Sequence, residues 1–203
     1  MKSREVTIYL IGFIFLLFGT GAIVNTLVMN TGFDAGLAPI LWACYVCMIL
    51  LGIGTIRKDS YLVLVQLNIL AIPLLFWNFD FFFHIIFGKT AFGIVDYFFV
   101  SGPIVGKIIS LQHLFSVPLS MYVLYLLKIK DIGAWKVSFA QMVILNLVTR
   151  FFSDRTDNIN CIFEPCANFI PSAFYQITWF IGVLILVYLT NLVWVRFWFL
   201  RER

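Results

Sequence analysis

TIYLIGFIFLLFGTGAIVNTLV, residues 7–28, is an unbroken run without a single charged side chain. An α-helix rises 1.5 Å per residue, so about 20 residues cross the roughly 30 Å hydrocarbon layer of a bilayer. Lys2 and Arg4 precede the run, as in a signal peptide, but the run is too long for one and no small-x-small cleavage site follows it. The stretch therefore predicts a first membrane-spanning helix.

The remainder of the chain has the same apolar character. Of its 203 residues 62% are hydrophobic and only 12% are charged, with a mean hydropathy of +1.00, whereas soluble domains are about half apolar and a quarter charged. Further apolar segments lie at about 37–55, 61–79, 104–127, 132–152 and 171–195. We expect one all-α domain over residues 1–203, a polytopic membrane bundle of about six transmembrane helices.

The number of crossings depends on DFFFHIIFGKTAFGIVDYFFVSGP, residues 80–103, which is apolar enough for a seventh span. With six spans and a cytoplasmic N-terminus, the cytoplasmic side holds ten of the 14 Lys and Arg residues: Lys2, Arg4, Arg57, Lys58, Lys128, Lys130, Lys136, Arg196, Arg201 and Arg203. This bias agrees with the positive-inside rule, and a seventh span would weaken it. We expect residues 80–103 to be a re-entrant or interfacial segment on the outer face, and both termini to be cytoplasmic.

Composition and motifs exclude several classes of protein. The net charge of +4 is small and scattered, so nucleic acid is not expected as a partner. The chain has no nucleotide-binding loop, no H-E-x-x-H and no G-x-S-x-G. With two histidines we expect no metal site and no cofactor, although Asp80, His84, Asp96 and His113 could together supply four ligands. The expected partner is the bilayer, with a lipid or amphiphilic small molecule, and nothing indicates an oligomeric state.

His113 is the first candidate for chemistry within the membrane. It lies about nine residues, roughly 13 Å, from the outer end of the segment 104–127. Gly106, Ser110, Ser116 and Ser120 share its helical face. This stripe fits a substrate groove with a catalytic imidazole. It fits equally a close helix contact around one buried histidine.

Asp80 and His84 are the second candidate, because a helix would place them one turn apart on one face. The carboxylate could then orient the imidazole, and the pair could act with His113 in catalysis. The alternative is an interfacial ion pair that caps a loop.

Arg150 is the candidate for holding an anionic head group. With Asn146 and Ser153 it forms a polar stripe, and a guanidinium can clamp a phosphate or a carboxylate through two hydrogen bonds. The alternative is an arginine at the outer interface, paired with Asp154 four residues later.

The outer loop SDRTDNINCIFEPC, residues 153–166, is the densest polar cluster. Asn158 and Asn160 would point the same way if the backbone is extended. With Asp96 on the other outer segment, they complete the set of candidate substrate-binding residues.

The four cysteines form two pairs. Cys161 and Cys166 lie in the outer loop and would form a disulfide in an oxidising compartment. Cys44 and Cys47 form C-x-x-C about ten residues from the outer start of the segment 37–55. The arrangement is similar to the membrane oxidoreductases DsbB and vitamin K epoxide reductase, but those are four-helix quinone enzymes with the motif near the outer face. Cys44 and Cys47 could instead be small buried apolar residues.

A second resemblance concerns residues 79–99, FDFFFHIIFGKTAFGIVDYFF, followed by SLQHLFSVPL (110–119) and DNIN (157–160). These stretches resemble a group of bacterial polytopic membrane proteins of unassigned activity, over about residues 55–165. The resemblance implies a location in the bacterial inner membrane and implies no activity.

Four functions remain open from the sequence. The leading hypothesis is an enzyme acting on a lipid or another amphiphile at an outward-facing polar site, with His113 as base or nucleophile. The alternatives are a small-molecule binding or transport protein and a structural membrane subunit. A membrane thiol oxidoreductase is a further alternative.

Overall fold

A computed structural model describes residues 2–29, 38–166, 173–197 and 200. The helices are α1 (Lys2–Met29), α2 (Ala43–Ile56), α3 (Ser60–Phe87), α4 (Asp96–Phe99), α5 (Ile104–Ser110), α6 (Gln112–Leu127), α7 (Ala134–Phe152) and α8 (Tyr175–Arg196), with 3-10 turns η1 (Ala38–Leu41) and η2 (Ile159–Cys161). The described ranges contain no strand. The predicted all-α class is therefore confirmed.

Four helical stretches are long and apolar enough to cross a membrane: Ser3–Val28, Ser60–Phe87, Ile104–Leu127 and Tyr175–Arg196. The third of them comprises α5 and α6, which meet at Leu111. Ala43–Ile56 is a shorter apolar helix. These four helices are compatible with a multi-pass membrane protein.

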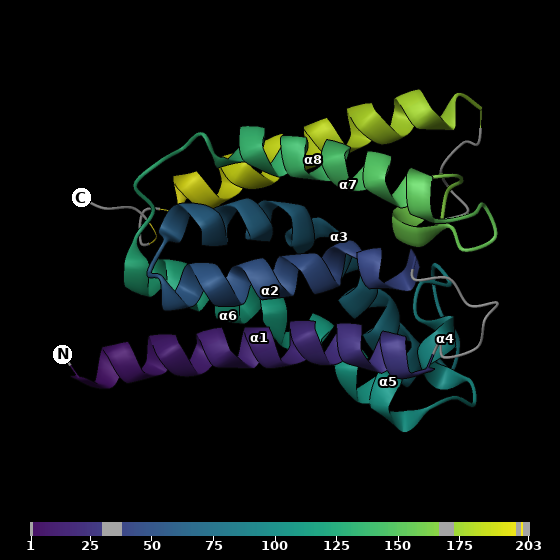
Figure 1. Ribbon diagram of the computed structural model, residues 1–203, viewed down its shortest axis with the longest axis horizontal. Helices are drawn as coiled ribbons and strands as arrows, with labels where there is room; N and C mark the ends of the chain where they lie inside the picture. The colour runs from purple at the N-terminus through teal and green to yellow at the C-terminus, as the bar shows by residue number, and fades with distance from the viewer. Residues whose placement is uncertain (1, 30–37, 167–172, 198–199, 201–203) are drawn as a thin grey trace.

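Successive long helices run in opposite directions, as Figure 1 shows. The start of α1 and the end of α8 lie at the same end of the bundle as the turns 57–59 and 128–133, and we name this end the terminal end. The opposite end, named the loop end, carries residues 88–103 and 153–166. Most of the candidate polar residues lie toward the loop end.

Helix α3 occupies the centre of the bundle and packs against α2, α6, α7 and α8. The stretch 63–71 is buried on every side, as expected for a helix that is hydrophobic all round. Asn68, within it, donates to Ser138 Oγ over 3.3 Å and to Asn191 Oδ1 over 3.1 Å. These amide contacts join α3 to α7 and α8 inside the apolar core, as polar side chains commonly do between membrane helices.

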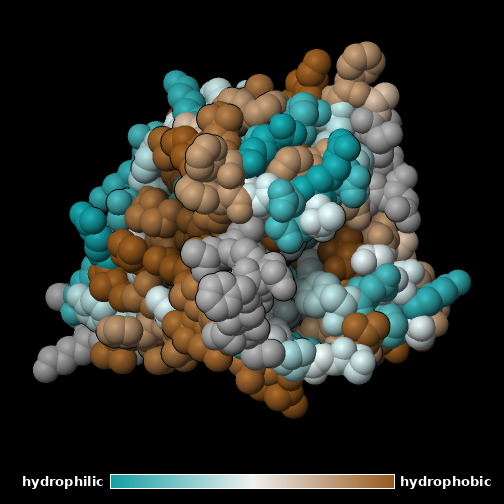
Figure 2. All heavy atoms as spheres, turned by 45° about the vertical axis from the view of Figure 1, so that its right-hand side comes forward, coloured by the Kyte–Doolittle hydropathy of each residue, from teal (hydrophilic) through white to brown (hydrophobic). Residues whose placement is uncertain are grey.

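The outside of the bundle is strongly apolar. Figure 2 shows hydrophobic residues over much of one face, with hydrophilic residues gathered in patches toward its upper part and margins. Large side chains such as Phe13, Ile86, Leu147 and Ile185 are more than half exposed. In water so large an apolar surface would cause aggregation, whereas lipid tails cover it without cost.

Helix α1 lies along α2, where Gly12, Gly19 and Gly52 permit close backbone approach. At the terminal end, Lys58 Nζ donates to Glu5 Oε1 over 2.6 Å. This contact holds the pKa of Lys58 above its ordinary value.

Two predicted segment boundaries differ from the structure. The third segment does not end at residue 79, because α3 continues to Phe87 and ends at Gly88, where φ is +69°. Glycine adopts this left-handed conformation without a steric penalty, and its N–H closes the helix on His84 O. The second segment was predicted to begin at about residue 37, whereas its α-helix begins at Ala43, after the 3-10 turn η1.

Candidate functional site

Asp80 holds the loop that follows α3. Its carboxylate is fully buried and accepts four backbone N–H groups, from Ala91, Phe92, Ile94 and Val95, over 2.6–3.1 Å. Hydrogen bonds to an ionised acceptor are about twice as strong as neutral ones. Asp80 therefore folds the chain back onto α3, and its oxygens are not free to orient an imidazole.

The predicted Asp80–His84 pair is not formed. The ring of His84 stacks on Phe99 with 3.6 Å between ring centroids. Its Nδ1 is buried and has no hydrogen-bond partner among the described residues. The helical spacing that suggested the pair is present, but the carboxylate is satisfied by the loop amides.

His113 is buried in α6 and lies against Trp77, with ring centroids 4.8 Å apart. Its backbone carbonyl accepts from the amide of Asn78 over 3.1 Å. The hydroxyls of Ser116 and Ser120 donate to carbonyls one turn back in their own helix. Ser116 and Ser120 are thus bonded within their own helix, and none of the contacts of His113 with described residues joins it to Asp80 or His84.

The remaining polar candidates of the loop end are also hydrogen-bonded within the protein. Asp96 accepts from the hydroxyl of Thr90 over 2.6 Å. Asn158 both accepts and donates hydrogen bonds within its own loop. Asn160 Oδ1 accepts from Ala43 N over 2.7 Å, which ties the outer loop to the start of α2.

Cys161 and Cys166 form a disulfide with 5.5 Å between their Cα atoms. Cys44 and Cys47 are free thiols. Because α2 begins at Ala43, the C-x-x-C motif lies in its first turns and not ten residues along a continuous helix. Cys47 is buried in the apolar core and Cys44 is half-buried against it, as small apolar residues would be.

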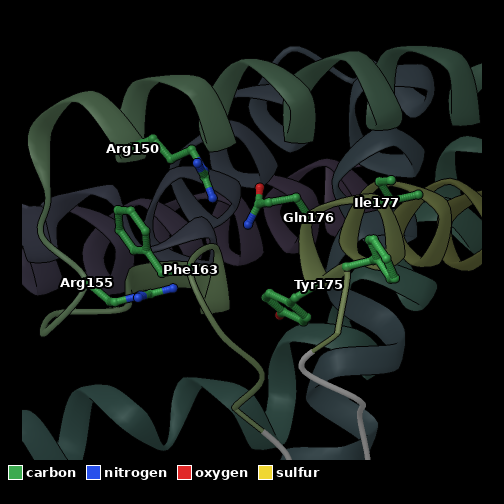
Figure 3. A pocket seen from close by; sticks show the side chains of 7 residues that line it. Arg150, Arg155, Phe163, Tyr175, Gln176 and Ile177 are labelled. Carbon is green, nitrogen blue, oxygen red and sulfur yellow. The ribbon is translucent and has the colours of Figure 1, made fainter.

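A cavity of about 590 Å³ opens at the loop end, among the end of α7, the loop 153–164 and the start of α8 (Figure 3). It is lined by Arg150, Arg155, Phe163, Phe174, Tyr175, Gln176 and Ile177. Its size is in the range of sites that hold small molecules. In Figure 3 the side chains of Arg150 and Gln176 point toward one another, and both donate to the backbone carbonyl of Ile162.

Arg150 does not form the predicted ion pair with Asp154. Its guanidinium donates to Ile162 O over 3.3 Å and lies 5.2 Å from the ring centroid of Phe163. The physical reason is that α7 ends at Phe152 and the next residue is extended, which removes Asp154 from the helical register.

The described residues that line the cavity carry a net positive charge. Arg150 and Arg155 are its charged residues, and no carboxylate is among the described residues that line it. Arg155 has no hydrogen bond or ion pair with a described residue. The sequence interpretation assigned Arg150 to a binding site but did not assign Arg155, Phe163 or Gln176 to one, although Arg155 and Phe163 lie in the loop 153–166.

No family model, curated protein or solved structure matches the chain. The resemblance to bacterial polytopic membrane proteins stays a prediction. What the protein binds is inferred from the chemistry of the site itself.

Proposed function

We propose that this protein is a multi-pass membrane protein that binds an anionic amphiphile, a molecule with a phosphate or carboxylate head and an apolar tail. The observation that carries the proposal is the cavity at the loop end with two arginines in its lining. A guanidinium presents five donors in a plane and matches the oxygens of such head groups.

Both guanidiniums have N–H groups that form no hydrogen bond with a described residue and could bind a ligand. Arg150 has one hydrogen bond, to Ile162 O, and Arg155 has none with a described residue. The hydroxyl of Tyr175, by contrast, already donates to Cys161 O over 2.6 Å. The arginines are therefore the groups in this cavity that would hold a negative charge.

The surroundings of the cavity favour an amphiphile over a free anion. Phe174 and Ile177 belong to its lining and are 83% and 60% exposed. Phe151 and Phe152, at the end of α7, are also largely exposed. If the head group of an amphiphile binds the arginines, its apolar tail would therefore lie against apolar side chains that face lipid.

The lining favours binding over catalysis. Acid–base and nucleophilic catalysis need a carboxylate, imidazole, thiol or activated hydroxyl at the reacting atom. Among the described lining residues the one hydroxyl, that of Tyr175, is engaged with a backbone carbonyl. His113, the predicted base, belongs to α6, which contributes no residue to this cavity.

For the membrane arrangement we propose six crossings by α1, η1–α2, α3, α5–α6, α7 and α8, in a bacterial inner membrane. The antiparallel order of these helices and the accumulation of Lys and Arg at the terminal end support this topology, with both termini cytoplasmic. The arginine cavity would then face the outer leaflet.

The length of α3 supports an interfacial position for the segment after it. Its 28 residues span about 42 Å, more than the roughly 30 Å of the hydrocarbon layer. The last turns of α3, with Asp80 and the loop folded onto it, would therefore lie at the outer interface.

The test is lipid binding by the purified protein in detergent, followed by native mass spectrometry. Phosphatidylglycerol should bind in preference to phosphatidylcholine. Arg155→Gln should weaken that binding roughly tenfold, because a hydrogen bond to a charged group contributes about 1.5–3 kcal/mol. Arg57→Gln, an exposed arginine at the terminal end, is the matched control and should have no effect. Equal binding of both lipids, or an unaffected Arg155→Gln variant, would contradict the proposal.

A further inference from the structure

A second cavity, of about 320 Å³, lies at the terminal end between the start of α7 and the last turns of α8. Its lining includes Trp135 and Lys136 from α7 and Tyr188, Asn191, Leu192 and Val195 from α8. The residues from α8 recur at intervals of three and four positions and so form one face of that helix. The cavity is separate from the arginine cavity, which opens at the opposite end of the bundle.

The unpaired polar groups in this lining are hydrogen-bond donors. Lys136 is exposed, and its ammonium forms no hydrogen bond or ion pair with a described residue. The indole N–H of Trp135 and the hydroxyl of Tyr188 also have no hydrogen-bond partner among the described residues. Asn191 offers no free acceptor, because its Oδ1 accepts from Asn68 and its Nδ2 donates to Ile132 O. The cavity is therefore matched to a ligand that accepts hydrogen bonds.

The charge of the lining favours an anion. Lys136 is the one charged residue among the described residues that line the cavity, and its Nζ lies 5.9 Å from the ring centroid of Trp135. Such a contact holds an ammonium at the aromatic face. Asp131 precedes the cavity in the chain but does not line it, and its Oδ1 accepts from Gly133 N over 2.6 Å. The accepting ligand is therefore expected to carry a negative charge.

The walls of the cavity favour a lipid over a free anion. The rings of Trp135 and Tyr188 meet edge to face, with 5.3 Å between their centroids. Tryptophan and tyrosine are enriched where a membrane meets water, because each has an apolar body and a polar edge. Ile132 in the lining is 59% exposed, and Leu189, next to Tyr188, is 53% exposed. An acyl chain would lie along these apolar side chains, whereas a free anion makes no use of them.

We propose that this cavity binds the phosphate head group of an anionic lipid in the leaflet at the terminal end, which the proposed topology makes the cytoplasmic leaflet. Lys136 supplies the positive charge as a compact ammonium with three donors, and Trp135 and Tyr188 supply one donor each. The bound lipid connects the start of α7 to the end of α8. This site shares no residue with the arginine cavity, so the inference goes beyond the proposed function and does not depend on it.

The test uses the full-length protein in nanodiscs with phosphatidylglycerol or phosphatidylcholine, each carrying a photoreactive group at the start of one acyl chain. Mass spectrometry of the cross-linked peptides locates the lipid. Phosphatidylglycerol should label residues 132–136 and 188–195 several-fold more than phosphatidylcholine does. Lys136→Gln should lower this labelling about fivefold, the contribution of one basic residue near an anionic membrane surface. Tyr188→Phe, which keeps the ring and removes the hydroxyl, should lower it by a smaller factor.

The control is Arg57→Gln, which removes an exposed positive charge at the same end of the bundle but outside the cavity, and which should retain the labelling. Equal labelling by the two lipids, or unchanged labelling in both Lys136→Gln and Tyr188→Phe, overturns the proposal. A loss in Arg57→Gln as large as that in Lys136→Gln overturns it as well, because the attraction would then be general. Displacement of phosphatidylglycerol by millimolar inorganic phosphate overturns the lipid as the occupant. Labelling of residues 150–177 reports on the arginine cavity, so the two proposals succeed or fail separately.

Discussion

At the scale of single residues, the polar side chains of the loop end mainly hold backbone. Asp80, Asn158 and Asn160 were candidates for chemistry, and each is occupied by main-chain groups. In a membrane this use is expected, because every buried backbone donor needs a partner where water is scarce. In the cavity at the loop end, the groups with unused N–H donors are Arg150 and Arg155.

Asp80→Asn should destabilise the protein by at least about 3 kcal/mol, because one amide oxygen cannot accept the four N–H groups that the carboxylate accepts. Thermal unfolding in detergent measures the effect. Asp96 is exposed, and its carboxylate accepts one hydrogen bond, from the hydroxyl of Thr90. Asp96→Asn should therefore change the melting temperature little. Equal losses in the two variants would contradict the role of Asp80.

Sequence spacing located these residues but not their partners. Asp80 and His84 do lie one turn apart in a helix, as the spacing indicates. Which groups they meet depends on residues 91–99, which fold back onto α3. Arg150 shows the same limit. Because α7 ends at Phe152, Asp154 does not lie one helical turn after Arg150 and does not pair with it.

At the scale of helices, close contacts and short loops decide the arrangement. A Cβ at Gly52 would lie 2.6 Å from Leu16 Cγ, and one at Gly19 would lie 2.9 Å from the backbone nitrogen of Ile49. Both distances are too short for a carbon atom. The contact between α1 and α2 thus depends on small residues, as is common between membrane helices.

Gly19→Ala should destabilise the α1–α2 contact by about 1–3 kcal/mol through overpacking. Gly21→Ala is the control, since a Cβ there has no atom within 4 Å and alanine favours a helix. Melting temperatures of the two variants in detergent provide the comparison. A lower melting temperature for Gly21→Ala than for Gly19→Ala would contradict the close contact at Gly19.

The outer loop depends on its disulfide as well as on Asn158. Ile162 and Phe163, which contact Arg150, lie inside the ring closed by Cys161 and Cys166. Replacing both of these cysteines by serine should weaken anionic lipid binding several-fold, because the loop loses a covalent constraint. The same replacement at Cys44 and Cys47 should leave binding unchanged. Binding that is insensitive to the loop disulfide would show that hydrogen bonds alone shape the cavity.

At the scale of the whole molecule, the apolar pattern predicted most helices, because lipid requires long apolar segments that satisfy their own backbone. The segment 132–152 coincides closely with α7, Ala134–Phe152. The cavity was not predictable in this way. It is made by the end of α7, the following loop and the start of α8, and only tertiary packing makes them neighbours.

The proposed six crossings would place the turns of the terminal end and those of the loop end on opposite sides of the membrane. In a variant with Cys44 and Cys47 replaced by serine, Lys89→Cys should react with a membrane-impermeant maleimide in intact cells. Arg57→Cys should react only after the cells are opened, because both positions are exposed but at opposite ends. Labelling of both variants in intact cells would be incompatible with the proposed topology.

The most direct test of the central claim is an experimental structure of the protein in lipid nanodiscs that contain phosphatidylglycerol. Head-group density is expected between Arg150 and Arg155, with the acyl chains along Ile177 and Phe174. A cavity closed by ion pairs from the arginines to Asp154 and Asp157, with lipid bound elsewhere, would contradict it.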